Sequence, residues 1–250
     1  MALDRHLSAI SVTDHDAVTG ADLALDASEG TDLEVVPGVE IGTLIDSREV
    51  HLLGYFIATD SPRLHEALAL LRRARLERAK EIVDKLTQLD VRISLQQVSD
   101  IAGDTEAIGR PHIAHALVKE GVVPSAKEAF DRYLSQGAPA YVPRYRMSAA
   151  DVLDLIREAD GLPVIAHPLD VLHVVPLLVD RGLGGLEAFY RGYTPGQISD
   201  LLEVANRYGL VPTGGTDFHG FDRDDAIVPG GVYVPPDTVE RLRARRGRSA

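Results

Sequence analysis

The sequence predicts an α/β fold, in which parallel strands alternate with helices. Short apolar runs of strand length are separated by intervals that have helical periodicity. This alternation is typical of α/β domains with a parallel sheet. In barrels of this class, chemistry collects at the C-terminal ends of the strands, and metal-capable side chains stand there in run after run of this chain. The runs, in chain order, are LSAISV, LEVVPGV, EVHLLGYF, LPVIA and LVPTGG.

Each of the five predicted strands carries, or is followed by, a side chain that can bind a metal ion. One of these positions taken alone is weak evidence, since His51 could be a half-buried strand histidine and Glu40 a surface carboxylate. Repetition at the same end of successive strands is much less easily explained by chance. The candidate ligands, in the order of the strands, are His15, Glu40, His51, His167, and the pair Asp217 and His219.

Residues 61–137 interrupt the strand pattern. From Leu64 onward, apolar residues recur at helical spacing with Arg and Glu on the other side, and further helical segments follow at 95–102, 111–120 and 126–134. We interpret 61–137 as an inserted helical subdomain, and 1–60 together with 138–250 as the strand-rich domain. The insertion is either a partial lid over that domain or an extension of its core.

Composition limits the classes of partner. Lys+Arg total 26 against 38 Asp+Glu, and the formal net charge of −12 disfavours a tight, nonspecific grip on duplex DNA. Phosphate substrates are still possible, because bound cations reverse the local charge at a site.

The absence of cysteine excludes thiolate metal sites and disulfides. No apolar run is long enough to span a membrane, the first residues lack a signal-peptide pattern, and no obligate protein partner is evident. We expect a cytoplasmic enzyme.

A mixed set of imidazoles and carboxylates suits Zn, Mn or Fe and discriminates poorly among them. Several such ligands can hold two or more cations a few ångströms apart. Phosphoester cleavage needs positive charge of this kind, because its transition state carries negative charge on the attacking and leaving oxygens. The candidate ligands therefore favour a metal-dependent phosphoesterase.

Seven ordered motifs resemble signatures of the polymerase-and-histidinol-phosphatase (PHP) family. They run from Ile10 to His219, and seven together are far more specific than any one alone. More narrowly, they are similar to the branch that contains nucleoside 3′,5′-bisphosphate phosphatases and a related 5′→3′ exoribonuclease activity on short RNA. The motifs are SVTDHDAVTG, VVPGVEIG, VHLLGYF, GRPHIA, YVP, VIAHPL and TGGTDFHG.

The resemblance implies a distorted (β/α)7 barrel with two or three Mn, Zn or Fe ions, held by the six candidate ligands. It also implies that metal-activated water hydrolyses a phosphomonoester of a small nucleotide or of short 5′-phosphorylated RNA. Asp14 would be a neighbour of the metal ligands or a proton carrier. The residues expected to take part in catalysis are Asp14, His15, His167 and Asp217.

Two further motifs supply candidates for binding a second substrate phosphate. Arg110 and His112 lie in GRPHIA, just before a predicted helix whose first turn would hold Pro111. A helix N-terminus is a natural phosphate site, and arginine can bind phosphate through two parallel hydrogen bonds. Arg144 in YVPRYR is another candidate, and Arg191 a further one. Each could instead be a surface or helix-start charge.

One departure from the PHP pattern concerns the start of the chain. Family members normally begin with a strand that carries His-x-His, whereas His6 has no partner at that spacing. We therefore expect the first strand to be missing and the chain to be less stable and less active than one with that segment restored. The missing His-x-His motivates one alternative, a catalytically impaired metal- or nucleotide-binding protein. The same fold leaves a second alternative, a histidinol-phosphate-type phosphatase.

Overall fold

The computed structural model describes residues 1–46, 48–103, 105, 107–220 and 228–247. Internal contacts divide the chain into two compact units. The sheet unit comprises Met1–His65 and Met147–Ala250, and the helical unit comprises Glu66–Arg146. The sequence suggested domain boundaries at 61 and 137. These boundaries remain a prediction, and the contact-based units are used below.

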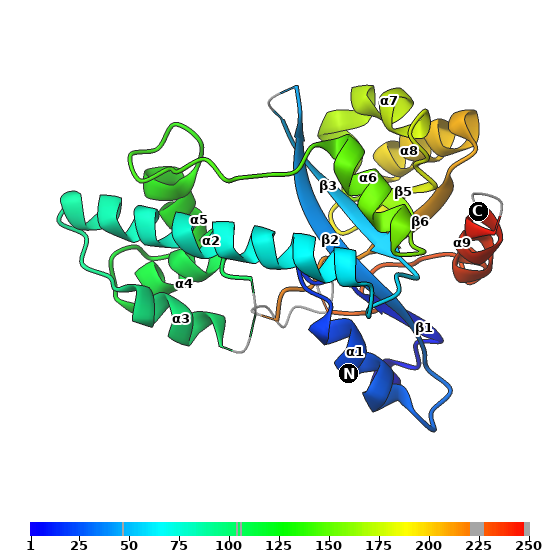
Figure 1. The fold of residues 1–250 in the computed structure, drawn as a ribbon, viewed down its shortest axis with the longest axis horizontal. Helices are drawn as coiled ribbons and strands as arrows, with labels where there is room; N and C mark the ends of the chain where they lie inside the picture. The colour runs from blue at the N-terminus through cyan, green and yellow to red at the C-terminus, as the bar shows by residue number, and fades with distance from the viewer. Residues whose placement is uncertain (47, 104, 106, 221–227, 248–250) are drawn as a thin grey trace. The chain divides into compact units, whose positions relative to one another are not determined.

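A six-stranded sheet forms the centre of the sheet unit and curls into a half-barrel (Figure 1). Its strands lie in the same order in space as in the chain, so neighbours in sequence are hydrogen-bonded neighbours. The strands are β1 (Ala9–Val12), β2 (Glu34–Ile45), β3 (Arg48–Tyr55), β4 (Leu162–Ile165), β5 (Gly185–Tyr190) and β6 (Val211–Gly215).

The expectation of parallel strands holds for three strand pairs and is wrong for the two that involve β3. The pairs β1–β2, β4–β5 and β5–β6 are parallel, whereas β3 is antiparallel to both β2 and β4. Only positions 46 and 47 separate β2 from β3, and a parallel partner would need a crossover of about a dozen residues or more. Because β3 alone is reversed, the C-terminal ends of the other strands still meet at one edge.

Helices flank this sheet, and their ends carry recognisable signals. The side chain of Thr194 accepts a hydrogen bond from the backbone of Gln197 at the start of α8, and α8 ends at Gly209, whose φ of 64° is left-handed. Ser148 caps α6 in the same way. The segments of the sheet unit are η1 (Leu3–Arg5), α1 (Thr19–Ser28), α6 (Ala149–Glu158), η3 (Pro168–Val174), α7 (Val175–Val179), α8 (Pro195–Tyr208) and α9 (Thr238–Arg246).

The apolar faces of the strands make the core of the sheet unit. One cluster joins the inner strands to α9 through Leu242, which is 4% exposed. Burial of an aliphatic side chain of this size contributes about 1.5–3 kcal/mol, so this contact fixes α9 against the sheet. The cluster consists of Val36, Leu53, Tyr55, Leu162, Val164, Ala166, Val211 and Leu242.

The helical unit has a core of its own, in which Leu86, Ile113 and Leu117 are fully buried. Helix α2 (Pro62–Gln88) begins in the sheet unit and continues into the helical one. The other segments are α3 (Leu95–Ala102), α4 (Arg110–Lys119), α5 (Ala126–Ala129) and η2 (Phe130–Leu134). Among the helices of the described residues, we find none with the length and apolar content that a membrane span requires.

Candidate metal centre

Three of the six predicted ligands surround a fourth, Glu40, which lies on β2 and is 6% exposed. Its Oε1 is 2.5 Å from Nδ1 of His51 and 3.9 Å from Nε2 of His167. Its other oxygen, Oε2, is 3.7 Å from Nδ1 of His15. A buried carboxylate is costly unless it is paired, so three surrounding imidazoles account for its presence here.

The parallel pairing of β1 with β2 brings His15 to Glu40. Beyond the end of β1, His15 and Glu40 form an isolated parallel bridge. The backbone N–H of Glu40 donates to the Asp14 carbonyl at 3.1 Å, and the N–H of Asp16 donates to the Glu40 carbonyl at 2.9 Å. The residues that follow β1 are therefore held beside β2 by the backbone itself, independently of any side chain.

The reversed strand β3 brings His51 to the same edge. His51 stands opposite Gly42 of β2, and its carbonyl accepts a hydrogen bond of 3.0 Å from Ala166 just beyond β4. The next residue, His167, has a left-handed φ of 31°, which is uncommon for a residue with a side chain. Its Nε2 lies 3.2 Å from Nδ1 of His51. Local backbone strain of this kind gathers at functional sites.

The geometry fits a divalent cation. One ligand atom each from His15, Glu40 and His51 can be chosen so that all three lie within 4.8 Å of one another. Imidazole nitrogen and carboxylate oxygen are the usual protein ligands of zinc and similar ions. This group is the observation in the structure that indicates metal binding.

The charges of the group reinforce one another. Burial alone would raise the pKa of Glu40, but the charges of His15 and His51 and hydrogen bonds from His51 and His167 hold it well below its usual value. Burial lowers the pKa of His51, yet the charge and hydrogen bond of Glu40 outweigh burial and raise it to about 9. In the metal-free protein the two residues therefore form an ion pair. A metal ion that binds here must displace a proton.

Asp217 and His219 come from the segment after β6. The ring centroid of His219 is 5.9 Å from that of His15, which places this residue beside the group around Glu40. Asp217 has a left-handed φ of 51°, and its Oδ2 accepts a hydrogen bond of 2.9 Å from the Tyr190 hydroxyl. The guanidinium of Arg191 lies 3.6 Å from the same oxygen. Two residues at the end of β5 thus orient the Asp217 carboxylate.

The side chain of Asp14 is directed toward the start of α1. A Cβ atom built on Gly20, in the first turn of that helix, would collide with the Asp14 carboxylate. A negative charge at this position complements the positive end of the helix dipole. Its predicted part in catalysis stays a prediction.

Glu187 is a residue of this site that sequence reasoning missed. It lies on β5, is 7% exposed, and accepts a hydrogen bond of 2.9 Å from the backbone N–H of His167. Burial raises its pKa to about 7, although that hydrogen bond acts in the opposite direction. The pairing of β5 with β6 shifts register between Glu187 and Phe189, an irregularity that often re-aims side chains near active sites. The available signal was a carboxylate inside the apolar run GLEAFY.

Three of the candidates for substrate binding, Arg110, His112 and Arg144, belong to the helical unit. Helix α4 begins at Arg110, with Pro111 in its first turn, as the sequence predicted. The Arg110 guanidinium donates to the Leu134 carbonyl at 3.3 Å, and His112 Nδ1 accepts a hydrogen bond of 3.0 Å from Gly109. Arg144 is 7% exposed. The substrate-binding role of these residues stays a prediction.

The comparisons with known proteins connect this geometry to a family. No family model matches the chain. A 5′-3′ exoribonuclease from Haemophilus influenzae is 32% identical over 240 residues, which cover 89% of this chain and 87% of that protein. The chain belongs to the PHP family of metal-dependent phosphoesterases.

Further relatives of this PHP chain act on different phosphate esters. A phosphoribosyl 1,2-cyclic phosphate 1,2-diphosphodiesterase from Eggerthella lenta is 30% identical. The match covers 88% of this chain and 86% of that protein. A 3′,5′-nucleoside bisphosphate phosphatase from Chromobacterium violaceum is 29% identical. The match covers 84% of this chain and 76% of that protein. The chain is therefore a hydrolase of phosphate esters.

The fold comparison agrees with this assignment. A protein from Bifidobacterium adolescentis described as a metal-dependent phosphoesterase superposes with a TM-score of 0.87 at 32% identity. The match covers 98% of this chain and 88% of the other. The predicted α/β fold of the PHP barrel type is confirmed.

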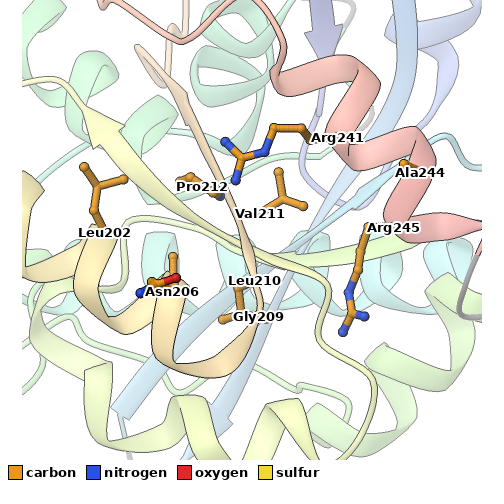
Figure 2. A pocket seen from close by; sticks show the side chains of 10 residues that line it. Leu202, Asn206, Gly209, Leu210, Val211, Pro212, Arg241, Ala244 and Arg245 are labelled. Carbon is orange, nitrogen blue, oxygen red and sulfur yellow. The ribbon is translucent and has the colours of Figure 1, made fainter.

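One cavity in the described part of this PHP chain lies away from the candidate ligands. It measures about 550 Å³ and is lined by the end of α8, the start of β6, and α9 (Figure 2). Asp217 follows the other end of β6, so this cavity opens at the opposite end of that strand. A smaller hollow, of about 380 Å³, adjoins Asp217 through Tyr190 and Arg191.

Proposed function

We propose that this PHP enzyme hydrolyses a phosphomonoester of a small nucleotide, such as a 3′,5′-bisphosphonucleotide, or acts on short 5′-phosphorylated RNA. The observation that carries the proposal is the convergence of His15, His51 and His167 on the buried Glu40. The names of the exoribonuclease and bisphosphate phosphatase relatives support the nucleotide as substrate class.

The six candidate ligands would hold two or three divalent cations, of Mn, Zn or Fe. Cations bound there would stabilise the charge that develops on phosphate oxygens and would lower the pKa of bound water. The ligands are His15, Glu40, His51, His167, Asp217 and His219.

The protein's own contribution is to fix the orientation of these side chains. Glu40 binds Nδ1 of His51, and Glu187 holds the backbone of His167. The Tyr190 hydroxyl donates a hydrogen bond to the Asp217 carboxylate and so orients it. Outer partners such as Glu187 and Tyr190 orient the ligands, and the loss of such a partner typically lowers metal affinity or activity about 10–100-fold. Asp14 remains our candidate proton carrier, and Arg110, His112 and Arg144 remain candidates for the second phosphate.

The test measures phosphate release from adenosine 3′,5′-bisphosphate. Treatment with EDTA should abolish release, and added Mn should restore it. His167→Ala should lower turnover about 100-fold or more, because loss of a ligand exceeds the loss of an outer partner. His173→Ala is the matched control, since His173 is exposed on η3 six positions further on. Turnover that survives both chelation and His167→Ala would contradict the proposal.

A substrate panel separates the nucleotide from the alternatives. Histidinol phosphate, a phosphoribosyl cyclic phosphate and a short 5′-phosphorylated RNA are compared at equal concentration. We expect the highest kcat/KM on the bisphosphonucleotide or the RNA. Metal binding without phosphate release from any of them would indicate the catalytically impaired protein instead. A cytoplasmic location, and the absence of duplex DNA and obligate protein partners, stay predictions.

A further inference from the structure

We propose that the hollow beside Asp217 is a nucleobase subsite, in which tyrosine rings stack on the base of the substrate. The proposal rests on the proposed function and names the part of the substrate that this surface recognises. The residues that build the subsite are Phe189, Tyr190, Arg191, Tyr193, Ile198 and Tyr233.

Aromatic side chains gather in this hollow. The chain has eight tyrosines, five phenylalanines and no tryptophan, and three of the tyrosines and one phenylalanine line this one surface. Tyr233 is 75% exposed, so a large ring faces solvent. The rings of Tyr190 and Tyr193 support each other at a centroid distance of 5.1 Å. An exposed aromatic surface of this kind marks a site of interaction more often than chance.

The hollow adjoins the candidate metal centre through Tyr190, one of its lining residues. The ring centroid of Tyr190 is 5.7 Å from that of His167, and the ring of Tyr193 lies next to that of Tyr190. A nucleotide whose phosphate lies at His167 would therefore extend its base along Tyr190 toward Tyr193. Arg191, which lies near Asp217, adds a positive charge where the sugar and phosphate would pass.

The aromatic lining of the hollow favours stacking on the base. The Tyr190 hydroxyl already donates to Asp217, which leaves its ring as the recognising surface. Ile198 adds an apolar side chain from the first turns of α8. Every base has a π-face, so binding by stacking tolerates any base. The subsite should require a nucleobase without selecting among adenine, guanine, cytosine and uracil.

The experiment compares ligands with and without a base. Calorimetry measures binding of adenosine 5′-monophosphate and of ribose 5-phosphate to the Mn-treated protein, and turnover is measured in parallel on adenosine 3′,5′-bisphosphate. Tyr193→Leu and Tyr233→Leu keep apolar bulk and remove the ring. Each should weaken adenosine monophosphate binding about 10-fold, within the range that stacking on one base supplies.

The same variants should leave ribose 5-phosphate binding unchanged. Tyr208→Leu is the control, because Tyr208 lies at the far end of α8 and outside the hollow. Guanosine and uridine monophosphates should bind within a few-fold of adenosine monophosphate.

Equal weakening of both ligands by the tyrosine variants would overturn the inference, as would adenosine monophosphate binding no better than ribose 5-phosphate. The same experiments test the proposed function separately from the subsite. Absence of phosphate release while the variants still weaken nucleotide binding would overturn the reaction and keep the subsite. Phosphate release with nucleotide binding unchanged in the variants would overturn the subsite alone.

Discussion

Glu40 and Glu187 are two buried carboxylates in one site, and their surroundings move their pKa values in opposite directions. Glu40 has cationic imidazoles around it, which hold its pKa low. Glu187 accepts a backbone hydrogen bond and stands among other carboxylates, so burial prevails and its pKa rises to about 7. One residue is therefore ready to bind a cation, and the other supports the backbone of His167.

The raised pKa of Glu187 predicts a pH-dependent stability of the metal-free protein. Its folded pKa of about 7 exceeds the ordinary 4.5, so the folded state binds the proton more tightly than the unfolded state. This contribution to stability is complete below about pH 4.5 and is lost as the pH rises through about 7. Glu187→Gln should be the more stable protein at pH 8, by at most about 3 kcal/mol.

Denaturant unfolding of metal-stripped protein between pH 4.5 and 8 checks this prediction. The difference in unfolding free energy between Glu187→Gln and the parent should grow with pH. Glu203→Gln, which changes an exposed carboxylate on α8, should follow the parent throughout. A difference that stays constant over the whole pH range would show that Glu187 titrates normally.

Individual residues differ in how far the sequence predicts them. Glu40 and His51 each have an ordinary interpretation when taken alone, and only their expected place at strand ends singled them out. That expectation is wrong in detail, because both lie inside strands, Glu40 in β2 (Glu34–Ile45) and His51 in β3 (Arg48–Tyr55). The structure brings these two residues together, as expected. Glu187 was missed because its run of six residues reads as a buried strand with one polar exception. The direction of the Asp14 side chain depends on α1, which motif spacing does not describe.

At the scale of the elements, the reversal of β3 was the feature that the sequence did not predict. The positions between β2 and β3 are Asp46 and Ser47, and this pair lacks the glycine that marks the common two-residue hairpin turns. The reversal matters for the site, because it places His51 opposite Gly42 and beside the end of β4.

The close approach of β1 to β2 predicts the effect of a substitution at Gly38. A Cβ there would lie 2.6 Å from the Thr13 side chain and 2.7 Å from Ser11 Oγ. Gly38→Ala should therefore destabilise the protein by about 1–3 kcal/mol, as overpacking typically does. Because Thr13 lies two residues before His15, the change should also weaken Mn binding.

Thermal unfolding and Mn titration of the variant measure both effects. Gly196→Ala is the matched control, since its nearest atom outside its neighbours is Thr194 Oγ1 at 4.0 Å. It should leave stability unchanged or slightly raised. Wild-type stability and Mn affinity in Gly38→Ala would contradict the tight contact between the strands.

At the scale of the whole molecule, the sheet explains why residues spread from 15 to 219 lie at one edge. All strands except β3 run in the same direction, so the segments that follow β1, β4 and β6 emerge together. Ordered motifs predicted this family and fold without any structure. The domain limits at 61 and 137 stay a prediction, and α2 runs through the first boundary between the two compact units without a break.

The most direct test of the metal centre is the metal content of the protein after dialysis against Mn, measured by elemental analysis. The parent should retain two or three ions, and Glu40→Gln should lose at least one of them together with phosphate release. Glu34 is an exposed carboxylate on the same strand and pairs with Arg243, so Glu34→Gln should retain the parent's metal content. A parent protein without bound Mn, or a Glu40→Gln variant with the parent's full content, would contradict a metal centre built around Glu40.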